Sequence, residues 1–191
     1  FEDPGRRLWA AMFHAISAYN NAGFGLWSNS LESYRDNPVV TGVIAFMIVI
    51  GGIGWRVAND IWNNRFRLGR LRRLSLHTRL VIRSTALLIV IGAVGLLITE
   101  HIGYGASAME PYGWLEDLQI VLFQSITTRT AGFNTIPLSA HQITDAGLLL
   151  IIVLMFIGAS PGGTGGGVKT TTFAILMGAT RSTLQGRSDV L

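Results

Sequence analysis

A short phrase that occurs twice constrains this chain more than any other feature of its sequence. Asn21-Ala22-Gly23-Phe24 ends one apolar, helix-like stretch, and Thr130-Ala131-Gly132-Phe133 ends another. Each copy follows a matching run, residues 13–17 in the first case and 123–127 in the second, and each precedes an apolar segment interrupted by glycines. A repeated unit of helix, glycine-containing bend and spanning helix is typical of a membrane protein that builds part of a symmetric pore.

The composition also favours a membrane protein. Hydrophobic residues make up 49% of the 191 residues and charged residues only 14%, whereas soluble domains carry about 25% charged residues. Uncharged runs cover residues 37–55, 84–99 and 146–168. Because a bilayer crossing needs roughly 20 predominantly apolar residues, each run predicts a span, the second one if it begins at Leu80. Without cysteine, disulfides and thiolate metal sites are excluded.

Basic residues predict how these spans are oriented. Eight of the fifteen Lys and Arg residues lie between Arg56 and Arg83, and acidic residues follow the second run. Under the positive-inside rule, the basic loop is cytoplasmic. We therefore expect a multi-pass protein of the plasma or inner membrane, in contact with membrane lipid, with residues 56–83 inside. A nucleic-acid partner is the rival explanation of the basic loop, and its position between two spans disfavours it.

Residues 118–128 form an uncharged stretch of 11 residues whose two flanks are both expected outside. This stretch is too short to cross a bilayer and predicts a re-entrant half-helix that turns near Gly132. Residues 8–31 are long enough to span, but their polar centre and their match to the second copy favour a re-entrant segment there too. The predicted fold is an all-α membrane protein of helix–pore-helix–helix repeats with re-entrant filter loops, potassium-channel-like.

The two turns suit a cation that leaves water. Backbone carbonyls in an extended loop can replace a hydration shell, and glycine permits backbone angles that other residues resist. A half-helix also directs its negative C-terminal end toward the cation. The alternative for each copy is a helix C-cap glycine with a packed Phe. Arg129 follows the second half-helix and is expected to support the filter, not to bind the ion.

A glycine-rich stretch inside the last apolar run is the second strong signal. Residues 158–169 contain a proline and several glycines that should break the helix, and a flexible loop in the permeation path is a candidate gate. A phosphate-binding loop is the rival, but its motif needs glycine before the Lys, where Val168 stands. Lys169 either sets an electrostatic barrier or extends to the cytoplasm. In the first repeat, Gly51-Gly52-Ile53-Gly54 predicts a milder interruption with close helix packing.

Three stretches together resemble the Ktr/Trk/HKT potassium transporters, most closely the KtrB-type membrane subunits of bacterial Ktr systems. They are residues 13–24, 127–135 and 158–172. The resemblance implies four repeats around one potassium path. Carried over by position, the potassium-binding carbonyls would belong to Asn21, Ala22, Gly23, Thr130, Ala131 and Gly132. Filter support would come from Asn20, Phe24, Arg129 and Phe133. The intramembrane gating loop would comprise Gly158, Ser160, Pro161, Gly162, Gly163, Thr164, Gly165, Gly166, Gly167 and Lys169.

The resemblance also implies a division of the chain. Residues 1–64 would be repeat two without its first helix, 65–78 a cytoplasmic basic loop, 79–180 a complete repeat three, and 181–191 a cytoplasmic linker to a missing repeat four. The chain would then supply two of four filter walls. The implied partners are a second full-length subunit, which forms a homodimer, and a cytoplasmic nucleotide-binding regulatory ring (KtrA/TrkA-like).

The expected function is therefore potassium uptake, with K+ as the transported ion. Sodium stays open as a coupling or activating ion, and no organic cofactor is expected. The histidines show no metal-ligand spacing and no nucleophile–base pair appears, so we do not expect an enzyme. The alternatives are a sodium-conducting relative and a non-conducting membrane assembly or scaffold subunit.

Overall fold

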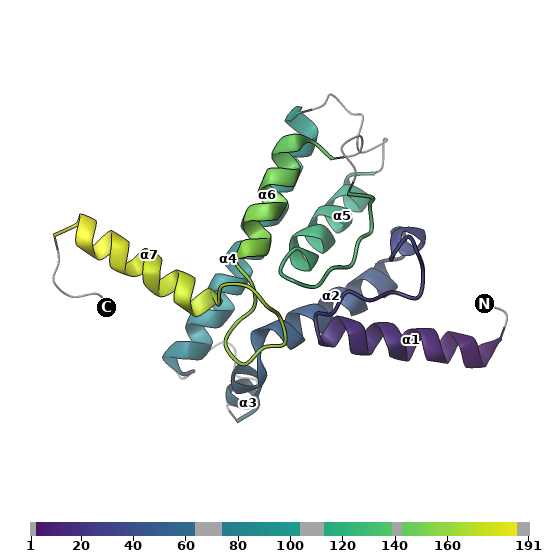
Figure 1. Cartoon of the computed structure of the whole chain (residues 1–191), viewed down its shortest axis with the longest axis horizontal. Coiled ribbons are helices and arrows are strands. Elements are labelled where there is room, and N and C mark those ends of the chain that lie inside the picture. The colour runs from purple at the N-terminus through teal and green to yellow at the C-terminus, as the bar shows by residue number, and fades with distance from the viewer. Residues whose placement is uncertain (1–2, 64–73, 104–112, 139–142, 187–191) are drawn as a thin grey trace.

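The computed structural model describes residues 3–63, 74–103, 113–138 and 143–186, without the side chains of 101–103. Most of the basic loop expected at 65–78 and the end of the linker expected at 181–191 lie outside these residues. The described elements are, in chain order, α1 (Pro4–Tyr19), a short 3-10 helix η1 (Glu32–Tyr34), α2 (Pro38–Ile53), α3 (Trp55–Asn63), α4 (Leu76–Gly103), α5 (Trp114–Thr127), α6 (Asp145–Phe156) and α7 (Thr170–Leu184) (Figure 1).

Polar residues fix where the helices begin. Pro38 opens α2 after Asn37, whose side-chain oxygen accepts from two amides of the first turn at 3.1 and 3.2 Å; such caps satisfy amides that have no partner inside the helix. Thr144 caps α6 in the same way, accepting from Gly147 at 2.9 Å. Its hydroxyl also donates to the buried carboxylate of Glu100 at 3.0 Å, which ties the start of α6 to α4.

Helix α4 is the clearest candidate for a membrane span. Leu76–Glu100 is long and apolar enough to cross a bilayer, with a mean hydropathy of 2.4. The pair α2 and α3 passes the same test together, although its two helices are bent by 94°. Gly54 sits at this bend with φ 85°, a backbone conformation that glycine adopts readily. The interruption predicted at Gly51–Gly54 is therefore present, and it is much shorter than the break between α6 and α7, although the chain turns sharply there.

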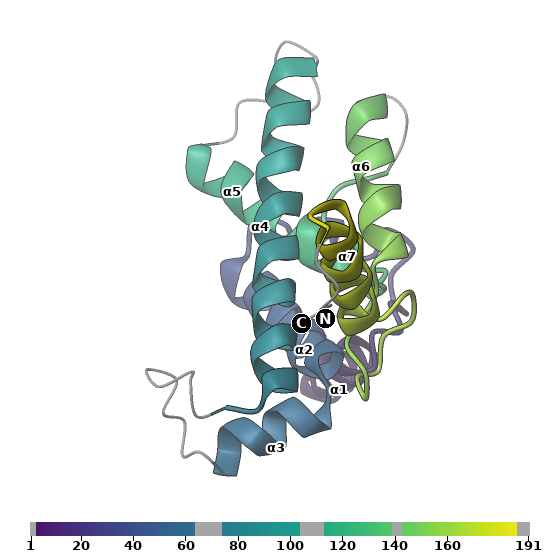
Figure 2. The same cartoon turned by 90° about the vertical axis from the view of Figure 1, so that its left-hand side faces the viewer.

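The second repeat unit packs through close helix contacts. Figure 2 shows the long α4 beside α5 and α6. Ser125 of α5 donates its hydroxyl to the carbonyl of Ile89 on α4 at 2.8 Å. A Cβ on Gly92 would collide with that hydroxyl and lie 2.9 Å from Leu154 of α6. The glycine thus allows α5 to lie directly against the long helix α4.

A buried cluster joins the two units. Phe133, the last residue of the second repeated phrase, is fully buried, and it packs with residues from α1, α2 and α5. The cluster consists of Ala18, Leu31, Ile44, Ile48, Phe123, Ala131 and Phe133. Because these residues come from both halves of the chain, the cluster fixes the position of the second turn against the first unit.

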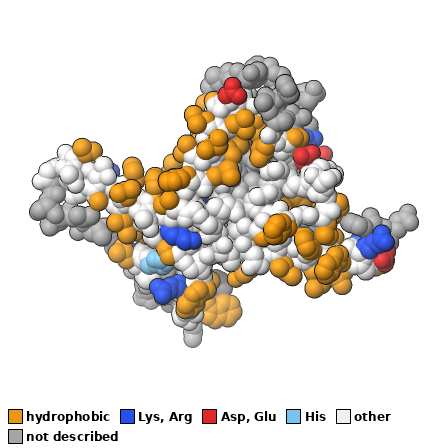
Figure 3. Space-filling model, viewed as in Figure 1, with side chains coloured by type: hydrophobic (Ala, Val, Ile, Leu, Met, Phe, Trp, Pro, Cys, Tyr) orange, Lys and Arg blue, Asp and Glu red, His pale blue; other side chains and the backbone are white. Residues whose placement is uncertain are grey.

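Hydrophobic side chains also cover outward faces of the molecule. Figure 3 shows them over α1 and α6, whereas the surface at the centre is mostly white. On α6, Leu149, Ile152 and Phe156 are each at least 63% exposed. Apolar faces of this kind are expected where a helix meets lipid or further protein.

Candidate functional site: two repeated turns and a glycine-rich loop

The two repeated phrases fold into turns with the same backbone pattern. Residues 20–24 form the first turn, after α1, and residues 128–133 form the second turn, after α5. Asn21 and Thr130, at matching positions, have φ of 50° and 70°, and Gly23 and Gly132 have φ of 71° and 86°. Left-handed backbone is uncommon for residues other than glycine, so its appearance twice in each turn shows that the sequence repeat is also a structural repeat.

A hydroxyl group fastens each turn to the half-helix before it. Ser17 donates to the carbonyl of Phe24 at 2.8 Å, and Thr127 donates to the carbonyl of Phe133 at 2.7 Å. The backbone carbonyls of Ser17 and Thr127 also accept hydrogen bonds from amides within the turns, at 2.9 and 3.0 Å. Sequence reasoning did not select Ser17 or Thr127. The sequence signal that indicates both anchors is the hydroxyl residue that ends each of the matching runs, 13–17 and 123–127.

The two turns touch each other at their glycines. A Cβ on Gly23 would collide with the carbonyl oxygen of Ala131 and lie 2.8 Å from the Cα of Gly132. A Cβ on Gly132 would lie 3.2 Å from the Cα of Gly23. Backbone atoms cannot rotate away as a side chain can, so the contact excludes a side chain at Gly23 and leaves little room for one at Gly132.

The surroundings of the two turns differ. His14 stacks on Trp27 with ring centroids 4.3 Å apart and accepts from the amide of Leu26 at 3.3 Å. At the matching position Gln124 is 1% exposed, and neither of its amide atoms has a hydrogen-bond partner within the described residues. The first unit thus supports its turn with a ring stack, and the second unit has an unsatisfied buried amide in that place.

The two phenylalanines assigned to filter support also lie in different environments. Phe133 is 0% exposed in the cluster between the units, whereas the side chain of Phe24 is 70% exposed. Asn20 is exposed as well, and its amide donates to the carbonyl of Ile16 within α1. Only the support residues that follow α5 therefore have buried side chains.

The glycine-rich loop, residues 158–169, interrupts the last apolar segment between α6 and α7. Its two ends lie close together, because the amides of Gly158 and Ala159 donate to the carbonyls of Val168 and Gly166, each at 3.0 Å. Figure 1 shows this loop near the corner between α2 and α3. The helix break predicted from the glycines and Pro161 is confirmed.

Hydrogen bonds hold this loop against the first unit. The amides of Ser160 and Thr164 donate to the carbonyls of Gly52 and Gly51 at 3.0 and 3.1 Å. A Cβ on Gly163 would collide with the carbonyl of Gly52. The two glycines that precede the α2–α3 corner thus present backbone carbonyls to the loop.

Two basic side chains bind the same loop. Arg129 is buried, and its Nη2 donates to the carbonyl of Gly158 at 3.1 Å. The ammonium of Lys169 donates to the carbonyl of Gly165 at 2.8 Å. The sequence predicts either an electrostatic barrier at Lys169 or a side chain that extends to the cytoplasm, and neither prediction includes this partner inside the loop. Arg129 lies at the C-terminal end of α5, where the helix dipole favours a cation.

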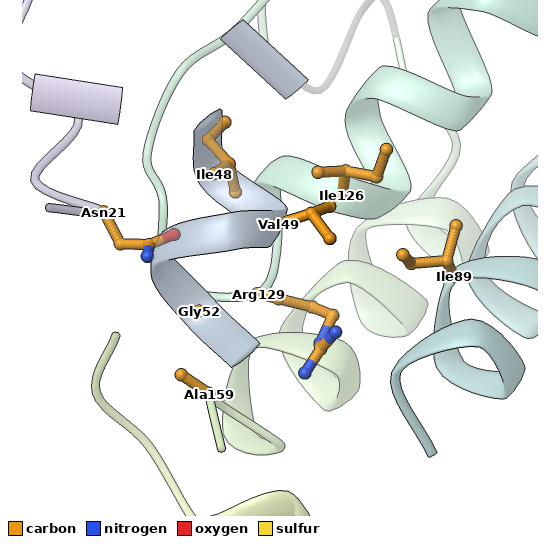
Figure 4. A pocket seen from close by; sticks show the side chains of 8 residues that line it. All are labelled: Asn21, Ile48, Val49, Gly52, Ile89, Ile126, Arg129 and Ala159. Carbon is orange, nitrogen blue, oxygen red and sulfur yellow. The ribbon is translucent and has the colours of Figure 1, made fainter. Parts of the chain in front are cut away.

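A small cavity remains where the first turn, α2, the second half-helix and the loop meet. Figure 4 shows the side chains around it. Its volume is about 10 Å³, which is close to the smallest space that holds one water molecule. The cavity is lined by Asn21, Ile48, Val49, Gly52, Ile89, Ile126, Arg129 and Ala159. Within the described residues, no group of three His, Cys, Asp or Glu could hold a metal ion.

Known proteins resemble the chain over almost its whole length. The sequence model of TrkH, described as a cation transport protein, matches residues 2–190. Ktr system potassium uptake protein B of Bacillus subtilis (strain 168) is 36% identical over 184 residues, which cover 96% of this chain and 40% of that protein. Potassium/sodium uptake protein NtpJ of Enterococcus hirae is 35% identical, with 95% of this chain and 38% of that protein covered.

A solved structure has the same fold. The crystal structure of the potassium transporter TrkH from Vibrio parahaemolyticus superposes with a TM-score of 0.72 at 21% sequence identity, over 93% of this chain and 36% of that one. At this identity the likeness concerns the fold alone, and it confirms the predicted all-α architecture. The chain spans about 40% of the length of these relatives.

Proposed function

The chain belongs to the TrkH family of cation transport proteins, and on that premise we propose that it contributes part of a potassium uptake path across the cell membrane. The relative from Bacillus subtilis is named as a potassium uptake protein. The apolar helix Leu76–Glu100 and the exposed apolar faces support a membrane location. The transported ion of this proposal is K+.

The observation that carries the proposal is the pair of matching turns. Backbone carbonyls of residues 21–23 and 130–132 would replace water around the ion. The repeated left-handed angles and the matching hydroxyl anchors support this assignment, because they give both turns one backbone path. The contact between Gly23 and Gly132 supports a shared path, since it brings the two turns together.

We propose that the glycine-rich loop, from Gly158 to Lys169, is the gate of this path. The loop lies against both turns: Thr164 binds Asn21, and a Cβ on Gly165 would collide with the hydroxyl of Thr130. The cavity among the turn, the helices and the loop has a volume of only about 10 Å³, which supports close packing of the loop against the turn. Arg129 would hold the loop in that position through Gly158.

The repeat boundaries belong to the same proposal. Residues 1–64 would form one repeat unit, 65–78 a cytoplasmic loop, 79–180 the next unit, and 181–191 a cytoplasmic linker, with the turns open to the outside. The short half-helices α1 and α5, of 16 and 14 residues, support re-entrant segments, because a crossing needs roughly 20 residues.

For the whole protein, we propose that two full-length subunits form a homodimer, which binds a cytoplasmic nucleotide-binding regulatory ring of the KtrA/TrkA type.

Sodium transport is the second candidate function. The relative from Enterococcus hirae is named for potassium and sodium together, and carbonyl ligands do not by themselves exclude Na+. Sodium could be conducted, or it could couple to or activate potassium uptake. A non-conducting scaffold subunit is the third candidate, and the repeated turns would then have no ion to bind.

Growth of potassium-uptake-deficient cells tests the proposal. The full-length coding sequence should restore growth at low potassium, and Gly132→Ser should abolish it, because a side chain there would press on Gly23. Gly178→Ala is the matched control, since nothing lies within 4 Å of its Cβ. Rescue by Gly132→Ser equal to the unsubstituted protein would reject the turn as an ion site. Sodium uptake without restored growth at low potassium would favour the second candidate.

A further inference from the structure

The hydroxyl of Thr164 lies between the glycine-rich loop and the first turn. It accepts from the side-chain amide of Asn21 at 2.7 Å and donates to the backbone carbonyl of Tyr19 at 2.9 Å. These partners are more than 140 positions away in the sequence, so the bonds exist only while the loop is seated. Thr164 is also exposed, and water or a hydrated ion can therefore compete for both partners.

The carbonyl of Tyr19 has a particular electrostatic position. Tyr19 is the last residue of α1, and the last carbonyls of a helix have no partners inside it. They form the negative end of the helix dipole, which favours a cation. A water molecule of a hydrated cation at this place would donate a hydrogen bond to the carbonyl, as the hydroxyl of Thr164 does here.

Neighbouring glycines hold Thr164 in this position. Gly163 and Gly165 flank it, and a Cβ on either would collide with the first or the second unit. A Cβ on Gly51 would collide with the carbonyl of Tyr19 and lie 2.9 Å from the hydroxyl of Thr164. The loop backbone thus packs closely between α2 and the turns, and the side chain of Thr164 forms a hydrogen bond with Asn21 of the first turn.

Building on the proposed potassium path, we propose that Thr164 is a positioning residue whose hydroxyl takes the place of a hydration water at the inner end of the first turn. It holds Asn21, whose carbonyl is assigned to the ion, and so links ion occupancy of the turn to the position of the loop. A cation with its waters at Tyr19 displaces the hydroxyl and releases the loop. Because coupling between two sites is reciprocal, a seated loop also weakens cation binding at the inner end of the turn.

Flux through the purified full-length protein in potassium-loaded liposomes tests this inference. One net hydrogen bond changes an equilibrium roughly 2- to 12-fold. Thr164→Val removes a hydroxyl that makes two hydrogen bonds and keeps the branched shape, so basal rubidium flux should rise by at least that factor. Thr164→Ser should bring the flux back toward that of the unsubstituted protein. Thr180→Val is the control, because the hydroxyl of Thr180 donates to the carbonyl of Leu176 within its own helix, α7.

A second readout separates coupling from a general loosening of the fold. The dependence of flux on potassium concentration should become shallower in Thr164→Val, since the ion no longer has a hydroxyl to displace. If Thr164→Val does not assemble, Thr164→Ala is measured instead, because it also removes the hydroxyl and places a smaller side chain in the loop. A folded variant with unchanged basal flux and unchanged potassium dependence overturns the role of Thr164. Absence of flux in every variant and in the unsubstituted protein would instead overturn the proposed transport function.

Discussion

Adding one methyl group at Gly23 is the most informative perturbation of the turns. Gly23 has φ 71°, and its Cβ would collide with a backbone carbonyl of the second turn and lie 2.8 Å from the Cα of Gly132. A residue with a Cβ costs about 1–2 kcal/mol in left-handed backbone, and overpacking costs about 1–3 kcal/mol. Gly23→Ala should therefore destabilise the contact between the turns by roughly 2–5 kcal/mol.

Gly132→Ala and Gly42→Ala complete this comparison. The Cβ of Gly132 would lie 3.2 Å from its nearest neighbour, so the variant should lose about 1–3 kcal/mol, mostly through its left-handed backbone. Nothing lies within 4 Å of a Cβ at Gly42, and alanine inside a helix is favoured over glycine by about 0.5–1 kcal/mol. The predicted order of damage is thus Gly23, Gly132, Gly42.

Two measurements on the full-length protein read out this order. Thermal unfolding in detergent reports stability, and rubidium uptake with sodium as competitor reports the ion site. Gly23→Ala should lose most uptake and discrimination between rubidium and sodium, whereas Gly42→Ala should keep both. If Gly23→Ala instead unfolds and transports like Gly42→Ala, the contact between the turns contributes neither to stability nor to ion discrimination.

Three further substitutions probe the groups around the turns. Ser17→Ala and Thr127→Ala each remove one hydroxyl anchor, worth about 1 kcal/mol, and should reduce discrimination between potassium and sodium, whereas Thr127→Ser should preserve it in competition assays. Arg129→Met removes a buried cation that binds the loop, and basal flux in liposomes should rise; a flux equal to that of the unsubstituted protein would count against the gate. Glu100→Leu removes the acceptor of the buried hydroxyl hydrogen of Thr144 and should lower the free energy of unfolding by about 1–3 kcal/mol, measured by thermal denaturation.

Much of the fold follows from simple patterns in the sequence. Uncharged length predicts the span within α4, and the glycines and Pro161 predict the break between α6 and α7. The match between the phrases at Gly23 and Gly132 predicts equivalent turns, because a repeated sequence tends to repeat its backbone. These features are local, so residue spacing and composition are enough to predict them.

Other features depend on contacts between distant parts of the chain. The glycines at the end of α2 predict an interruption, but its bend of 94° occurs where the glycine-rich loop packs on Gly54, which local sequence does not indicate. Lys169 looked equally suited to the path and to the cytoplasm, and its partner at Gly165 depends on how the loop folds back. The bond between Thr164 and Asn21 joins two repeat units, so only the packed structure reveals it.

The central claim is that backbone carbonyls of the two turns bind the transported cation. A crystal structure of the full-length protein soaked with rubidium tests it directly, because rubidium scatters anomalously and stands in for potassium. The account predicts anomalous peaks between residues 21–23 and 130–132, with backbone carbonyls as the nearest protein atoms. Peaks elsewhere, held by side-chain carboxylates or away from both turns, would contradict it.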